Sequence, residues 1–208
     1  MAHKPITAKI IQEQLRAVAK EMFAETAAEA HAKKKARFAL RADEESVLAI
    51  TARRQNPTLT MMLHSLSEYR LGRTWELTLH RSALVAGQPS IDHGCRCCDQ
   101  LLHRNHIEAK ARRLSIDPLS RTFDNLNISG LPAGKPQMLI PTLLIRPDRA
   151  LPEVLWLDGR WVTKNGGQHR DAKLQVNITP AGLERLREEG RIVSFHQLAS
   201  NLNKTCSC

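Results

Sequence analysis

Thiol and imidazole side chains gather in one short stretch near the middle of the chain. Cys95 and Cys98 have the C-x-x-C spacing, and His103 and His106 follow soon after them. A tight turn at that spacing aims two sulfur atoms at one point, as a tetrahedral Zn²⁺ requires. We therefore predict a zinc knuckle with Cys95 and Cys98 as its first two ligands.

Several residues could complete this zinc site. One ligand set is all thiolate and brings in the end of the chain, a second is local, and mixed sets use Cys97 or His93. The thiolate set is Cys95, Cys98, Cys206 and Cys208, and the local set is Cys95, Cys98, His103 and His106. Either set fills the tetrahedron and leaves no position for water, so the expected role of the zinc is structural. The alternative without metal is that Cys97 or Cys98 is a small buried residue and the histidines face solvent.

The sequence lacks the catalytic signatures that we searched for. It has no G-x-x-x-x-G-K-[ST], G-x-G-x-x-G or G-x-S-x-G motif. It also lacks H-E-x-x-H and the combination of H-x-E with a downstream P-C-x-x-C, which are two signatures of zinc hydrolases. The carboxylates are scattered and form no evident acid–base pair. We therefore expect a protein that is not an enzyme, with a metal-dependent hydrolase that uses His103 and His106 as a less favoured alternative.

The chain is strongly basic. Its net charge is +10, with a pI near 9.8. Residues 1–113 contain 19 Lys and Arg against 12 Asp and Glu, and residues 114–208 contain 12 against 9. Such an excess favours polyanionic partners, because each cation can neutralise one phosphate. The predicted phosphate contacts are Lys33, Lys34, Lys35, Arg53, Arg54, Arg104, Arg112 and Arg113.

The same charges have simpler interpretations. The lysine run can solvate one helix face, and Arg112 with Arg113 can satisfy a helix C-terminus, where cations are favoured. Base-stacking aromatics are few, since Trp75, Trp156 and Trp161 all fall at expected strand positions, where core packing explains them. We therefore expect contact with a nucleic-acid backbone or duplex rather than stacking on a single strand.

The elements that must position these residues change character along the chain. Apolar spacing predicts helices over about 10–23 and 58–72, and a further helix from Asp43 to Asn56. Alternation at Trp75, Leu77 and Leu79 predicts a strand, and the Leu, Ala, Lys and Arg content of residues 99–114 predicts another helix. Residues 115–137 are rich in Pro and Gly, as is typical of a linker.

Strand signals dominate the last third of the sequence. Asp158-Gly159 between two apolar runs predicts a hairpin, and Asn165-Gly166-Gly167 predicts a second turn. Alternation over Leu174–Ile178 predicts the returning strand. Thr179-Pro180 then predicts the start of a helix that ends at Gly190, because Thr is a good N-cap and Pro fits the first turn.

These observations lead to one overall interpretation. We expect an α+β protein with a helical, basic part (1–114) that holds the zinc knuckle, a linker (115–137), and an antiparallel β-rich part with a closing helix (138–208). It has no secretion signal and no apolar run long enough for a bilayer, so the expected location is the cytoplasm, where thiols stay reduced. The predicted function is non-enzymatic binding of DNA or RNA, as an accessory subunit of a nucleoprotein assembly. The competing function is an inhibitor or adaptor that binds an acidic protein surface.

Overall fold

The structure is a computed structural model of the 208-residue chain. It describes residues 4–36, 57–95, 98–102, 105–115, 123–168 and 173–204. Helices and strands both contribute, and the class is α+β as expected. The helix predicted between Asp43 and Asn56 lies outside the described residues.

A mixed sheet forms the middle of the fold. Its strand order is β1-β2-β3-β6-β7-β10, and β4 also pairs with β6. β6 runs parallel to β3 and β4 but antiparallel to β7. The strands are β1 (Ser90–Cys95), β2 (Cys98–Leu102), β3 (Asn105–Ile107), β4 (Lys110–Arg113), β6 (Leu139–Ile145), β7 (Glu153–Asp158) and β10 (Ile192–Val193).

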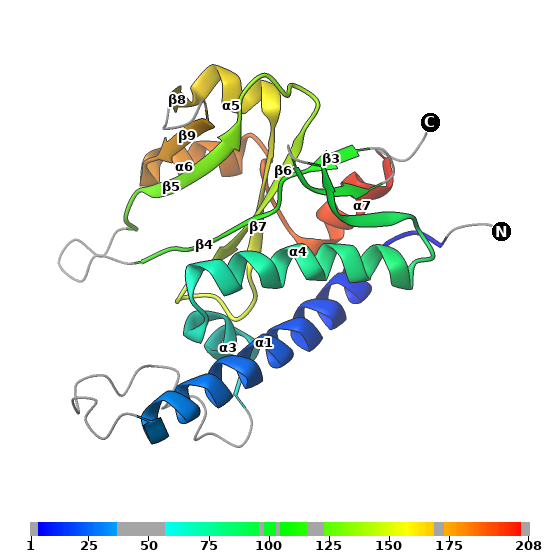
Figure 1. The fold of residues 1–208 in the computed structure, drawn as a ribbon. Helices are drawn as coiled ribbons and strands as arrows, with labels where there is room; N and C mark the ends of the chain where they lie inside the picture. The colour runs from blue at the N-terminus through cyan, green and yellow to red at the C-terminus, as the bar shows by residue number, and fades with distance from the viewer. Residues whose placement is uncertain are drawn as a thin grey trace.

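Helices cover one face of this sheet (Figure 1). They are α1 (Ala8–Ala36), α3 (Leu59–Ser65), α4 (Glu68–Val85) and α7 (Phe195–Lys204). Their buried residues form a first core with Ile107, Leu143 and Val154 of the sheet. Trp75 of α4 lies at its centre with no exposed surface, and its Nε1 donates to the main-chain oxygen of Pro141 on β6 at 2.8 Å.

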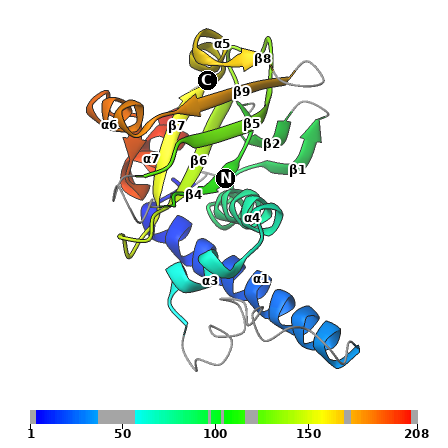
Figure 2. The ribbon, with the colours of Figure 1, turned by 90° about the vertical axis from the view of Figure 1, so that its left-hand side faces the viewer.

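A second layer covers the opposite face. It consists of a three-stranded sheet and two short helices, and Figure 2 shows β5 and β9 crossing over β6 and β7. The elements are β5 (Leu126–Pro132), α5 (Gly159–Asn165), β8 (Gly167–Gln168), β9 (Lys173–Ile178) and α6 (Pro180–Glu188). The burial of β7 alternates accordingly: Val154 and Trp156 join the first core, whereas Leu155 and Leu157 join the second.

The two expected parts of the chain contribute to a common core. The first core contains residues from Ile6 to Leu202, and β4 pairs with β6 across the expected linker. The side chain of Asn203 also binds both main-chain groups of Ile6, accepting from its nitrogen at 3.0 Å and donating to its oxygen at 2.7 Å. The expected linker itself contains strand β5.

The predicted strand at Trp75–Leu79 is wrong, because these residues lie inside helix α4. Leu71, Trp75 and Leu79 are spaced by four and are fully buried, so the apolar pattern has the helical period as well as the alternating one. Ser67 is extended and its side chain accepts from the Arg70 nitrogen, which starts α4 with an N-cap. The helix predicted over 58–72 is therefore interrupted at Leu66 and Ser67.

The helix predicted over residues 99–114 is also wrong. This segment forms β2, β3 and β4. Ile107, Ala109 and Ala111 are buried at every second position and belong to the first core. Pairing with β6 overrides the helix propensity of the Leu, Ala, Lys and Arg residues here, since intrinsic propensity is small beside tertiary packing.

The predicted hairpin at Asp158-Gly159 and the predicted helix start at Thr179-Pro180 had different outcomes. Asp158-Gly159 ends β7, but the chain then enters α5 instead of turning back, and Asp158 Oδ1 accepts from the Trp161 nitrogen at 2.8 Å. Glycine is required next to it, because a Cβ at Gly159 would lie 1.8 Å from the Lys135 oxygen. The helix start at Thr179-Pro180 is confirmed, with the Thr179 hydroxyl accepting from the Gly182 nitrogen.

Candidate functional site

Two of the predicted metal ligands, Cys95 and Cys98, lie at the ends of β1 and β2 that face each other in the main sheet. The Cα atoms of Cys95 and Cys98 are direct partners in the antiparallel ladder, a relationship that places them about 4.5–5.5 Å apart. His106 on β3 pairs with Leu101 on β2. Leu101 lies three positions from Cys98 along β2, which is about 10 Å of strand. His103, Cys206 and Cys208 lie outside the described residues. Within the described ranges, no group of three or more His, Cys, Asp or Glu is arranged to hold a metal ion.

Most of the predicted phosphate contacts have no described side chain. Lys33, Lys34 and Lys35 lie near the C-terminal end of α1, and Arg53, Arg54 and Arg104 fall outside the described residues. Arg112 and Arg113 lie on β4, and the structure describes their side chains.

Arg112 and Arg113 both bind the carboxylate of Glu68 at the start of α4. The distances are 3.6 Å from Arg112 Nη1 and 3.2 Å from Arg113 Nη2. Arg112 Nε also donates to the main-chain oxygen of Asn127 on β5, and Arg113 Nη1 donates to that of His64 on α3. Arg113 thus satisfies a carbonyl in the last turn of a helix, although the helix is α3 and not the one expected to contain Arg113. Both guanidinium groups fasten β4 to its neighbours.

An open pocket of about 560 Å³ lies beside these arginines. It is lined by His64, Glu68, Arg113, Leu114, Ser115 and Pro147. The Ser115 hydroxyl donates to Asp124 at 2.5 Å, so it already has an acceptor. The pocket therefore combines an imidazole and a carboxylate that are four residues apart with a guanidinium from a distant part of the sequence.

His64 is the least satisfied polar group in this pocket. Burial lowers the pKa of its imidazole, the positive charge of Arg113 lowers it further, and a hydrogen bond with the main chain of Arg146 acts in the opposite direction. Its Nε2 is buried and has no hydrogen-bond partner among the described residues. The neutral form is therefore favoured, and the buried Nε2 is a polar atom without a partner among the described residues. No sequence motif marks His64, because most of its neighbours in the pocket, Arg113, Leu114, Ser115 and Pro147, come from distant segments.

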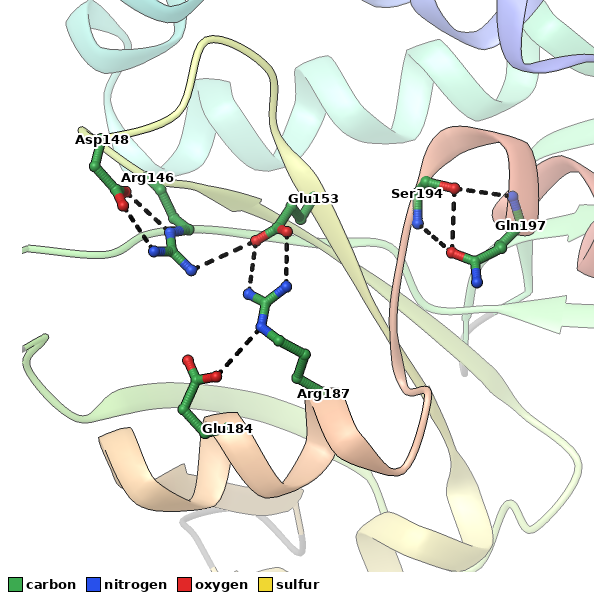
Figure 3. Close-up of polar contacts among 7 residues, drawn as sticks. All are labelled: Arg146, Asp148, Glu153, Glu184, Arg187, Ser194 and Gln197. Atoms are coloured by element: carbon green, nitrogen blue, oxygen red, sulfur yellow. Dashed lines mark hydrogen bonds and ion pairs between the residues drawn. The ribbon is translucent and has the colours of Figure 1, made fainter.

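A chain of alternating charges joins β6, β7 and α6 (Figure 3). Arg146 binds Asp148 through two hydrogen bonds and lies 3.6 Å from Glu153, which in turn receives two hydrogen bonds from Arg187. Arg187 also pairs with Glu184 at 3.4 Å. The hydrogen bonds from Arg187 lower the pKa of Glu153, and those from Arg146 lower the pKa of Asp148, in both cases against the opposing effect of burial.

The guanidinium of Arg146 is itself nearly buried. Its side chain is 9% exposed, and it lies 4.5 Å from the centre of the Phe123 ring, in the range of a cation–π contact. Carboxylates and an aromatic face thus occupy its surroundings. This chain of charges holds the second layer to the main sheet and offers no free cation to a ligand.

Comparisons of this chain with protein-family models, curated proteins and solved structures gave no match.

Proposed function

We propose that this protein is a non-enzymatic nucleic-acid-binding protein that contacts phosphates through cations left free by its own carboxylates. Nearly all the acidic side chains that the structure describes are already engaged. Glu25 and Glu188 are the exceptions; each of the others makes an ion pair or a hydrogen bond. The positive excess therefore resides in cations that are available to a partner.

Nine basic side chains of the described ranges are exposed and have neither an ion pair nor a hydrogen bond. They are Lys4, Arg16, Lys20, Lys135, Arg149, Arg160, Lys164, Lys173 and Arg185. Arg16 and Lys20 lie on the exposed side of α1, whose last turns also contain the lysine run. This surplus of free cations is the observation that carries the proposal, because phosphate contacts require cations whose charge is not already neutralised.

A structural zinc ion is part of this proposal. The opposed Cα atoms of Cys95 and Cys98 support it, since two residues placed this way can present two thiolates to one ion. The remaining ligands would come from the candidates named above. Zinc at this position would tie the β1–β2 end of the sheet to another segment and stabilise it.

No helix in the described part of the chain has the length and apolar character needed to cross a bilayer.

The test is a salt titration of binding. Labelled duplex and single-stranded oligonucleotides are titrated with the purified protein at several salt concentrations, and the logarithm of the affinity is plotted against that of the salt concentration. Phosphate contacts release counterions, so we expect a straight line whose slope is about −0.9 per contact on duplex DNA. Lack of binding at low salt, or affinity independent of salt, would contradict the proposal and favour a protein partner.

A further inference from the structure

The three-stranded sheet has one face that no element of the described chain covers. Its inner face is apolar, with Val176 and Ile178 of β9 buried in the second core. The alternate residues Lys173, Gln175 and Asn177 therefore project outward. Asn177 is paired with Asn127 of β5 across the ladder, and both are exposed. We call this outward surface of Asn127, Lys173, Gln175 and Asn177 the amide face.

Free cations lie around one end of the amide face. Lys173 pairs with Pro132, where β5 leads into the turn of residues 133–137 that contains Lys135. This turn packs on the start of α5, since a Cβ at Gly159 would clash with the main-chain oxygen of Lys135. Figure 1 shows α5 and β8 together at the end of the molecule far from α1.

Helix α5 adds two more cations to the same end. Arg160 and Lys164 are exposed and four residues apart, so they lie on one side of the helix. The end of α5 also touches β9, because a Cβ at Gly166 would lie 3.4 Å from the main-chain oxygen of Gln175. The four cations Lys135, Arg160, Lys164 and Lys173 thus belong to segments that contact one another at one end of the three-stranded sheet.

This region is almost free of acidic residues. Residues 125–147 contain no Asp or Glu, and residues 159–183 contain only Asp171, which lies outside the described residues. Asp158 stands next to α5 but is engaged, because it caps the helix and lies 3.5 Å from Arg191. A surface with cations, amides and no described free carboxylate is complementary to a polyanion.

We infer that the amide face, with Lys135, Arg160 and Lys164 at its edge, is the surface that docks a B-form DNA duplex. This inference rests on the proposed function and names the place of contact. The cations contact phosphates, and the amides of Asn127, Gln175 and Asn177 contact base edges, for which Asn and Gln are suited through their paired donor and acceptor.

The chemistry of the face selects the duplex. It carries no aromatic side chain, so it has no platform on which the bases of a single strand could stack. The major groove of B-form DNA is wide enough for a β-ribbon, whereas that of an A-form RNA helix is too narrow and deep for side chains to read. DNA duplex is therefore the expected ligand, with single strands and RNA duplex as the comparison ligands.

The experiment compares two pairs of exposed cations in the full-length protein. One variant is Arg160→Gln with Lys164→Gln, and its matched control is Arg16→Gln with Lys20→Gln, a pair with the same spacing on α1. Binding of a labelled DNA duplex is measured across salt concentrations for both variants and the unchanged protein. Each lost phosphate contact lowers the slope by about one unit, so we expect a loss of about two units for the α5 variant and a smaller change for the control.

A third variant tests the amides. Asn127→Ala with Asn177→Ala leaves the charge unchanged, so we expect its salt slope to equal that of the unchanged protein. We expect its affinities for duplexes of different sequence to become more alike, by at least several-fold, because base contacts carry the sequence preference. Equal sequence preference before and after the change would overturn the role of the amides. Circular dichroism and thermal melting of all three variants confirm that the fold is retained.

The outcomes separate this inference from the function on which it rests. If the unchanged protein binds no nucleic acid at low salt, the proposed function fails. If it binds and the α5 variant loses no more slope than the α1 control, the function stands but the docking surface is wrong. Tighter binding to single strands or to RNA duplex would overturn the assignment to DNA duplex.

Discussion

Glu153 and Arg187 face each other through two hydrogen bonds of 2.9 Å each, in the fork-to-fork arrangement of a carboxylate and a guanidinium. The pair joins the first residue of β7 to the last turns of α6. The side chain of Glu153 is only 20% exposed, and Arg146 lies on its other side. Its negative charge therefore balances two guanidinium groups that pack against the same strand.

Removing the charge of Glu153 should destabilise the fold. We expect Glu153→Gln to lower the free energy of unfolding by about 1–3 kcal/mol, as for other hydrogen bonds to charged groups. Glu184→Gln is the matched control, because Glu184 is mostly exposed and binds the same arginine. Urea denaturation at pH 7 measures both changes. Equal losses of unfolding free energy in the two variants would contradict the prediction that Glu153 contributes more to stability than Glu184.

The acid limb of stability should depend on the same residue. The pKa of Glu153 is lowered in the folded protein, so between that value and the unfolded value of about 4.5 the unfolded state binds more protons. The stabilisation is therefore present above pH 4.5 and lost as the pH falls through the folded pKa. We expect unfolding free energies measured from pH 6 to pH 2 to fall less steeply in Glu153→Gln than in the unchanged protein.

His64 should give stability a second pH dependence at higher pH. Its pKa is lowered from 6.5 by burial and by Arg113, so the unfolded chain takes up a proton at a pH where the folded protein does not. Stability contributed by the neutral imidazole is therefore complete above about pH 6.5 and declines as the pH falls below it. We expect His64→Gln to flatten the profile between pH 7.5 and 5, and NMR titration of the ring to show a pKa below 6.5. A ring that titrates above 6.5 would contradict this prediction.

Arg113 should matter to stability before it matters to binding. Arg113→Gln removes the donor that binds the His64 oxygen at 2.7 Å, and we expect a loss of about 1–2 kcal/mol in unfolding free energy. Lys164→Gln, which changes an exposed cation without described partners, should cost at most about 0.5 kcal/mol. Chemical denaturation measures both losses of unfolding free energy. The nucleic-acid affinity of the Arg113 variant must be measured at a temperature at which the variant is fully folded.

Metal content tests the zinc prediction directly. Cys95→Ser should lose the metal and much of the stability, because binding of structural zinc is coupled to folding. Cys206→Ser and His106→Asn then distinguish the ligand sets, since only a true ligand should lower the zinc content of purified protein. Zinc-free unchanged protein with the same melting temperature as Cys95→Ser would contradict the prediction.

Local signals in the sequence were sufficient where the structure depends on neighbouring residues. The Thr179-Pro180 helix start and the helix over about 10–23, which lies within the longer α1, follow from capping and apolar spacing alone. Trp75 was ambiguous, because apolar residues at 71, 75, 77 and 79 fit both a helix and a strand, and the packing of α4 against α1 decides between them.

Other features depend on contacts that no local pattern contains. Strand β4 forms because β6, about 30 residues later in the sequence, offers an edge for parallel pairing. The pocket around His64 likewise joins residues near 64, 114 and 147. The amide face requires the pairing of Asn127 with Asn177, so composition could suggest a polyanionic partner but not the surface that we propose for it.

Strands β6 and β7 belong to both apolar cores, with alternate residues on either side. Neither core can open without exposing the shared strands, so the described layers should behave as one cooperative unit. Hydrogen exchange would show this as main-chain amides of β6 and β7 that exchange only when the whole molecule unfolds. A substitution in either layer should then lower the protection of both strands by the same free energy.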